Sequence, residues 1–260
     1  MSPENHAAHK LNIFSSDGKT IVSTATRIIR ETALTVNING QTAVSIACTG
    51  KHPKELAAGY LRSEGIITAR EDIAKITVNS KNNRVDIVLK NKNATSVKFI
   101  KNIASSGARG RSIAPSSFQP LLVPDNFIIS AELALQLMEN LLDKSILHNE
   151  THGTHCSALA DAKDIFALRE DIGRHNTIDM LGGYALLNKI DLSAAIILTT
   201  GRISAEIVYK VWNLGVPVVI SHSAPTTKAV ELVRLANITL IGYVRSGGMN
   251  IYSHERRVKI

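Results

Sequence analysis

Three apolar runs decide the fold: AAIILT at residues 194–199, VPVVIS at 216–221 and ITLIGYV at 238–244. Each run has the length of a strand, and segments with helical periodicity at 203–214 and 226–236 separate them. Near-continuous apolar strands that alternate with helices are typical of a parallel sheet covered on both faces. The C-terminal part of the chain, residues 125–260, is therefore predicted to be an α/β domain.

The segments before this domain have a different character. Residues 20–103 alternate Val, Ile and Thr with polar residues, which predicts a smaller β-rich domain. Its strands are expected at 32–38, 41–48, 75–78, 84–89 and 95–100. Asn39-Gly40 predicts a type I′ turn between the first two, and a helix is expected from Pro53 to Gly65.

Three further segments complete the expected organisation. Residues 1–19 are polar and are predicted to be a flexible tail. Residues 104–124 are rich in Ser, Gly and Pro, which favours a loop or a linker between the domains. A long amphipathic helix is expected from Ser130, a suitable N-cap, to Leu147.

Composition narrows the function classes. The 260 residues carry a formal net charge of +8, which favours polyanionic partners such as phosphorylated cofactors, acidic protein surfaces or nucleic acid. Only five Phe and five Tyr are present, so nucleic acid is not favoured. The longest apolar runs are too short to cross a membrane, and the N-terminus lacks the apolar stretch of a secretion signal. A cytoplasmic protein is expected.

The cysteine count excludes two kinds of scaffold. Cys48 and Cys156 are the only cysteines, too few for a disulfide framework or a four-thiolate zinc site. The run THGTHC at 151–156 places two histidines beside Cys156, but His155 and Cys156 are neighbours and would point to opposite faces of a strand. No metal site is expected, and a buried, inert Cys156 is the favoured interpretation.

Donor-rich loops follow each of the three apolar runs. The first contains Thr200, Arg202 and Ser204, the second spans 221–226 around Ser223, and the third spans 243–248. In a parallel sheet, ligands bind beyond the carboxyl ends of the strands. Three such loops at one edge predict a site for a phosphorylated ligand.

Two other segments carry chemical groups. ASSGARGR at 104–111 combines glycines with two arginines, and a solvated flexible loop is an equal interpretation. REDIGRHN at 169–176 places Asp171, Arg174 and His175 just before or within the start of a helix. These three residues offer acid, base and anion-binding groups, and a polar connection with self-compensating charges is the alternative.

Taken together, the segments resemble the formate dehydrogenase accessory sulfurtransferase family (FdhD). The matching stretches occur in one order along most of the chain: Cys48-Thr49, 55–61, 63–67, 151–159, 169–179, 200–206, 221–231 and 242–252. Each stretch alone is modest evidence, whereas the ordered set is highly specific.

The resemblance implies a fold and a function. The fold would be similar to that of cytidine deaminases, without their zinc, with a parallel or mixed sheet as its core. The family takes sulfur as a persulfide from a cysteine desulfurase and passes it to the molybdenum bis(molybdopterin guanine dinucleotide) cofactor destined for formate dehydrogenase. The resemblance also implies a homodimer. It implies cofactor binding at the segment Tyr243, Val244, Arg245, Ser246, Gly247 and Gly248, to which the loop analysis adds Arg202 and Ser223.

The chain departs from the family pattern at two places. Where the family carries Cys-Gly-x-Cys-Gly, this chain has Ser106-Gly107-Ala108-Arg109-Gly110, so both cysteine positions are lost. Sulfur transfer needs a thiolate nucleophile, which neither Ser106 nor Arg109 supplies. Gly248-Met249-Asn250 also replaces the family's Arg-Phe-Asn, which removes one cationic contact.

The departures leave several hypotheses open. The chain is a sulfur carrier in which Cys156 replaces the missing thiols, activated by His155 or His152, or it binds the cofactor without transferring sulfur. A small nucleotide-processing enzyme with Asp171 and His175 as acid and base is the competing class, and a pure protein-binding adaptor is a third. Whether the chain is an enzyme is left undecided by the sequence.

Overall fold

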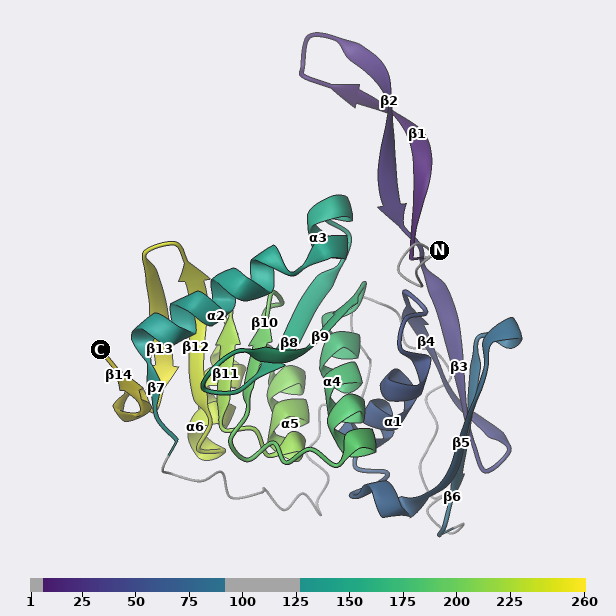
Figure 1. Ribbon diagram of the computed structural model, residues 1–260, viewed down its shortest axis with the longest axis vertical. Coiled ribbons are helices and arrows are strands. Elements are labelled where there is room, and N and C mark those ends of the chain that lie inside the picture. The colour runs from purple at the N-terminus through teal and green to yellow at the C-terminus, as the bar shows by residue number, and fades with distance from the viewer. Residues whose placement is uncertain (1–6, 92–126) are drawn as a thin grey trace.

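A computed structural model describes residues 7–91 and 127–260 of the chain (Figure 1). Strands in these residues form a six-stranded sheet, a four-stranded sheet and two two-stranded sheets. The predicted linker, 104–124, and the strand expected at 95–100 lie outside the described residues. The proposed domain boundaries there stay predictions.

The six-stranded sheet is the centre of the C-terminal part. Its strand order is β13-β12-β11-β10-β8-β9. The bounds are β8 (His155–Ala160), β9 (Ile165–Asp171), β10 (Ile196–Thr199), β11 (Val218–Ser221), β12 (Thr239–Arg245) and β13 (Gly248–Ser253). The three strands predicted from the apolar runs, β10, β11 and β12, are mutually parallel, as expected. The other three pair antiparallel, so the sheet is mixed.

Helices cover both faces of this sheet (Figure 1). Helix α2 (Ala131–Asp143) packs on one face with Leu137, Met138 and Leu141. The other face is covered by α4 (Arg174–Asn188), α5 (Ala205–Leu214) and α6 (Thr227–Leu235).

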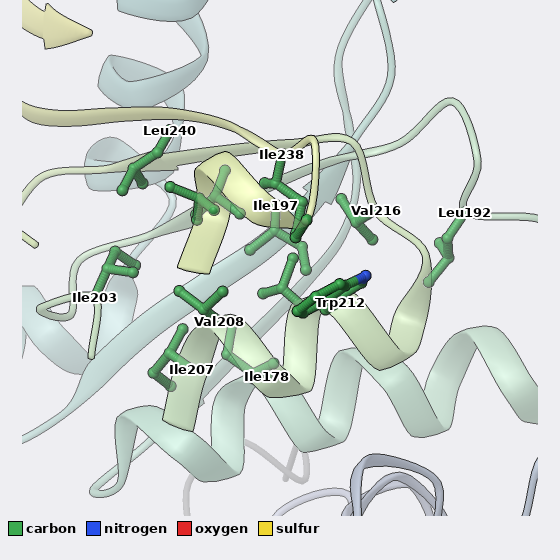
Figure 2. Packing of buried hydrophobic residues seen from close by; sticks show 14 of the residues in the cluster. Ile178, Leu192, Ile197, Ile203, Ile207, Val208, Trp212, Val216, Ile238 and Leu240 are labelled. Carbon is green, nitrogen blue, oxygen red and sulfur yellow. The ribbon is translucent and has the colours of Figure 1, made fainter. Parts of the chain in front are cut away.

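Figure 2 shows the core beneath α5, where Val208 and Trp212 pack with Ile178 of α4 and Ile197 of β10. Successive residues Ile196 and Ile197 belong to opposite cores, since side chains alternate along a strand. The coverage of both faces explains why these strands are apolar throughout.

The N-terminal part is β-rich with one helix, as predicted. The four-stranded sheet has the order β4-β3-β6-β5, with β3 (Thr32–Ile38), β4 (Gln41–Cys48), β5 (Ile73–Asn79) and β6 (Arg84–Leu89). Asn39 and Gly40 both have positive φ (51° and 85°), as a type I′ turn requires. Helix α1 (Pro53–Ser63) starts with Pro53 and packs Leu56 and Leu61 onto this sheet.

Helices α1 and α4 join the two parts. A Cβ atom on Gly59 would lie 1.7 Å from the Asp179 carbonyl oxygen, and one on Gly183 would lie 1.9 Å from the Glu55 carbonyl oxygen. The two helix backbones therefore touch where they cross. Met180 of α4 belongs to the core of the four-stranded sheet, so α4 is buried between the two sheets.

The prediction of a flexible tail at 1–19 is wrong for most of its length. Strand β1 (Ala8–Ser16) pairs antiparallel with β2 (Ile21–Ile29) in a hairpin that projects from the body (Figure 1). Arg27 of β2 forms a 3.0 Å ion pair with Glu150, which ties the hairpin to the end of helix α3 (Ile146–Thr151). Most residues of β1 are exposed, so neither face of the strand needs to be apolar. The resulting polar sequence is also typical of a flexible tail.

The helix predicted for 130–147 is broken. Ser130 caps α2 by accepting a hydrogen bond from the Leu133 amide, as expected, but α2 ends at Asp143 and α3 (Ile146–Thr151) follows. The Ser145 hydroxyl donates to the Leu141 carbonyl at 2.5 Å, which satisfies a carbonyl at the end of α2. The small elements are β7 (Ile129–Ser130), β14 (Val258–Lys259) and three 3₁₀ turns, Arg70–Asp72, Ser80–Asn82 and Glu255–Arg257.

Candidate functional site

The three predicted loops meet at one edge of the six-stranded sheet. We define the sheet rim as residues 200–204, 221–226 and 243–248, which lie at the carboxyl ends of β10, β11 and β12. The Ser223 hydroxyl donates to the Thr200 carbonyl at 2.8 Å, and the Tyr243 amide donates to the Ser223 carbonyl at 3.1 Å. The convergence predicted from parallel strands is therefore confirmed.

Arg245 fixes the outer end of the rim. Its guanidinium stacks on the Tyr243 ring at 4.8 Å and donates to the carbonyls of Val244 and His222. Tyr243 is 53% exposed and has a positive φ of 54°, and it lies in β12 where the pairing with β13 is interrupted between Gly242 and Arg245. The rim thus presents an exposed aromatic ring beside an arginine.

The remaining residues of the 243–248 segment differ in how far their side chains are exposed to solvent. Ser246, Gly247 and Gly248 are exposed at the β12–β13 turn, where Arg245 pairs with Gly248 and Gly247 has a φ of 92°. Val244 is 2% exposed and packs in the core beneath α2. Its predicted contact with a ligand is therefore restricted to its backbone.

A cluster of cationic side chains lies behind the rim. Arg174, the first residue of α4, packs against Gly201, where a Cβ would lie 2.9 Å from the Arg174 Cβ. Burial and then the adjacent Arg202 lower the pKa of Arg174. Burial and then Arg174 lower the pKa of His155 at the start of β8. Like charges gathered in this way favour a bound anion.

A histidine links the cluster to the outer rim. His148 of α3 contributes to the lowered pKa values of both His155 and His222, each of which burial lowers first. Its Nδ1 atom lies 2.5 Å from the Thr154 carbonyl. His148 was not predicted as part of the site, because the expected helix ended at Leu147 and the short helix α3 was not foreseen.

Asp171 has no free group for acid or base chemistry. It is 0% exposed, and its carboxylate accepts hydrogen bonds from the Thr49 amide (2.8 Å), the Asn176 side chain (2.6 Å) and the Gly173 amide (3.1 Å). These bonds hold the β4–α1 loop against the start of α4. The interpretation of Asp171 as a catalytic acid or base is therefore wrong.

His175 is also removed from solvent. Its Nε2 atom lies 3.1 Å from a Glu206 oxygen, and burial lowers its pKa to about 3. A histidine with this pKa is neutral at physiological pH and is a poor acceptor for a proton. The pair predicted for nucleotide processing is not assembled.

Cys156 does not have the surroundings of a reactive thiol. It is 0% exposed in the core beneath α2, and burial raises its pKa to about 12. Its backbone is fixed by the Thr200 hydroxyl, which accepts from the Cys156 amide at 3.0 Å. The hypothesis of Cys156 as a substitute sulfur carrier is therefore wrong, because β8 pairs with β9 and β10 on its two sides and α2 covers the thiol.

A first prediction follows from both cysteines. Cys48 is also buried, and burial raises its pKa to about 12. We expect neither thiol to react with iodoacetamide in the native protein at about pH 8, because the thiolate is the reactive form. Mass spectrometry would measure the alkylation, with the unfolded protein as the control in which both react. Labelling of native wild type that disappears in Cys156→Ser would restore Cys156 as a candidate.

Other features of the described residues add no second centre of chemistry. In these residues, no group of three or more His, Cys, Asp and Glu side chains is placed to hold a metal ion. No helix among them is long and apolar enough to cross a membrane. A cavity of about 380 Å³ lies away from the rim, beside β9, and is lined by Lys51, His52, Lys144 and Phe166 among others. Ser106 and Arg109 lie outside the part that the structure describes.

The fold and the rim define a class: a mixed α/β protein that carries arginine and small polar residues at the carboxyl ends of its parallel strands. The chain belongs to the FdhD/NarQ family, whose model matches residues 29–259.

Relatives with high coverage are named "Sulfur carrier protein FdhD". The protein from Bacillus pumilus is 37% identical over 235 residues, covering 89% of this chain and 90% of the relative. The protein from Bacillus subtilis is 36% identical over 240 residues, covering 90% of each.

A solved structure has the same fold. It is described as a formate dehydrogenase accessory protein from Desulfotalea psychrophila, and it matches with a TM-score of 0.81. The match covers 97% of this chain and 99% of that chain, at 21% sequence identity. The likeness confirms the predicted α/β fold with its mixed sheet.

Proposed function

We propose that this chain is an accessory protein in formate dehydrogenase maturation, and that its sheet rim binds the molybdenum bis(molybdopterin guanine dinucleotide) cofactor. The names of the relatives support a role in sulfur delivery, and the description of the similar solved structure supports formate dehydrogenase as the client. The convergence of Arg202, Ser223 and Arg245 at one edge supports the binding role and is the single observation that carries it.

The residues of the rim suit the guanylated ends of this cofactor. Guanine nucleotides supply phosphate charges and a flat base. Arg202 is exposed, Arg245 is exposed beside Tyr243, and the cluster at Arg174 adds positive potential. Among the described residues, the buried atoms Arg174 Nε and Ser204 Oγ have no hydrogen-bond partner. Guanidinium groups and small hydroxyls are the donors that phosphate prefers.

Cofactor binding without sulfur transfer has stronger structural support than a role as a sulfur carrier. Both cysteines are buried with raised pKa values, and the family's two loop cysteines are replaced by Ser106 and Arg109. A sulfur carrier needs a thiol that its donor can reach. We therefore propose that the chain holds the cofactor while another thiol supplies the sulfur. A cysteine desulfurase partner, a homodimer and a cytoplasmic location stay predictions.

The second prediction tests the rim with GDP as a fragment of the cofactor. We expect GDP to bind wild type, and Arg245→Ala to bind it about tenfold more weakly, because a charge-assisted hydrogen bond contributes about 1.5–3 kcal/mol. Isothermal titration calorimetry would measure both affinities. Arg84→Ala is the matched control, since Arg84 lies in β6 and pairs with Asp86 at 3.0 Å. No heat and no melting shift at millimolar GDP would contradict cofactor binding.

A further inference from the structure

Arg174, Arg202 and His155 form a second cluster of donors, beside the rim segment that carries Tyr243 and Arg245. Arg174 lies across Gly201, which places its guanidinium next to that of Arg202. His155 lies at the start of β8 beside the same loop, since its neighbour Cys156 donates its amide to the Thr200 hydroxyl at 3.0 Å, and Arg174 helps to lower the pKa of His155. Three cationic or potentially cationic groups share one small region.

Acidic groups only partly offset this cluster. Glu206 raises the pKa of Arg174, but its effect is smaller than the opposite effect of Arg202. Glu206 also lies 3.1 Å from the ring of His175. Two guanidiniums held together with incomplete compensation repel each other, so the arrangement is stabilised when a dianion lies between them.

Unfilled hydrogen-bonding positions surround the same region. The N-caps of α4 and α5, Gly173 and Ser204, make no side-chain capping bond, whereas Thr226 caps α6 by accepting from the Ala229 amide at 3.3 Å. The buried atoms Arg174 Nε and Ser204 Oγ have no hydrogen-bond partner among the described residues. The Asp171 carboxylate already lies at the start of α4, so the free groups beside the cluster are the Arg174 guanidinium, the Ser204 hydroxyl and the positive end of the α5 dipole.

From these contacts we propose that Arg174, Arg202 and His155 form a phosphate subsite, and that Tyr243 with Arg245 forms a separate subsite for the base. A nucleoside diphosphate would lie across the ends of β10, β11 and β12, with its phosphates at the start of α4. Adjacent strands are about 4.8 Å apart, so the two subsites are separated by roughly 10 Å, a distance that an extended nucleotide spans. The proposal rests on the proposed function and specifies which end of the ligand each residue holds.

Substitutions in the two subsites are expected to reduce the affinity for different ligands. Arg174→Gln removes the guanidinium group, which in the proposed site donates hydrogen bonds to the phosphates alone. We therefore expect it to weaken GDP binding about tenfold and to leave guanosine binding within about twofold. Tyr243→Ala removes the surface for the base, so we expect it to weaken GDP, GMP and guanosine by similar factors. This third prediction is a change in ligand preference, which a general loss of folding would not produce.

Calorimetry with guanosine, GMP, GDP and inorganic pyrophosphate would measure these preferences on the full chain. Arg174→Lys keeps the charge without the fork and is expected to fall between wild type and Arg174→Gln. Arg84→Gln is the control for a lost surface arginine, and a melting temperature for each variant verifies folding.

The outcomes separate the two proposals. Equal losses for GDP and guanosine in Arg174→Gln, or none, would overturn the phosphate subsite while GDP binding by wild type still supports cofactor binding. If wild type binds pyrophosphate in a way that depends on Arg174 but binds no nucleotide, the subsite stands and the cofactor role fails. If wild type binds none of the four ligands, both fail.

Discussion

Replacing Gly183 with alanine is expected to destabilise the folded protein by about 3 kcal/mol or more. The new Cβ would lie 1.9 Å from the Glu55 carbonyl oxygen of α1, and a backbone atom has no rotamer with which to move away. The two helices would have to separate, and the packing of Met180 against the four-stranded sheet would be lost with them. Urea denaturation followed by circular dichroism would measure the change.

Gly182→Ala is the matched control on the same helix. Its Cβ would meet the Leu214 side chain at 2.8 Å, and the end of a leucine can rotate. The gain in helix propensity, about 1 kcal/mol, offsets the cost of that rearrangement. We expect the urea concentration at the midpoint of unfolding of Gly182→Ala to stay close to that of wild type. Equal urea midpoints for Gly183→Ala and wild type would contradict a direct backbone contact between α1 and α4.

Replacing Lys210 with methionine is expected to cost about 3–5 kcal/mol of stability, because it leaves a buried carboxylate without its partner. The Lys210 ammonium donates to both oxygens of Asp179 at 2.9 and 3.0 Å and to the Ser63 hydroxyl at 2.8 Å. Burial alone would lower the pKa of Lys210, but Asp179 and Glu64 outweigh it and raise that pKa. The pair is fully buried where α1, α4 and α5 meet.

The loss of folding stability caused by Lys210→Met should depend on pH. Burial raises the pKa of Asp179, and in the variant no ammonium opposes this effect. A carboxyl whose folded pKa is raised loses stability as the pH rises above its unfolded value of about 3.9. Acidification from about pH 7 toward pH 4 should therefore narrow the gap between variant and wild type in urea denaturation.

Two further variants define the origin of the effect. Lys228→Met removes an exposed ion pair with Glu231 and is expected to change little, since water screens such pairs. Lys210→Met combined with Asp179→Leu removes both buried charges and should recover much of the loss. A deficit that the double variant does not reduce, and that does not vary with pH, would assign the effect to packing alone.

The strands and the rim could be predicted because their signals are local. Continuous apolar runs identified β10, β11 and β12, and parallel strands must end at the same edge, so the convergence of Arg202, Ser223 and Arg245 followed without coordinates. The turn at Asn39-Gly40 was equally accessible, because few residues adopt positive φ.

The failures have a common physical origin in distant contacts. The favoured interpretation of a buried, inert Cys156 is confirmed, and the alternative role as a sulfur carrier failed because β8 lies between β9 and β10, a pairing that crosses the whole of α4. Asp171 is structural because Thr49, far away in the sequence, donates to it. The end of α2 was missed since no Gly or Pro interrupts it, and the hairpin of β1 was missed because neither of its faces is buried.

The backbone contact between α1 and α4 has a mechanical consequence for the ligand site. Helix α4 begins with Arg174, and further along the same helix Gly183 rests directly on α1, which carries the four-stranded sheet. Close-packed interiors transmit displacement because they contain little compressible space. A displacement of α1 would therefore be passed to Arg174, so the seating of the four-stranded sheet and the position of this arginine are mechanically coupled.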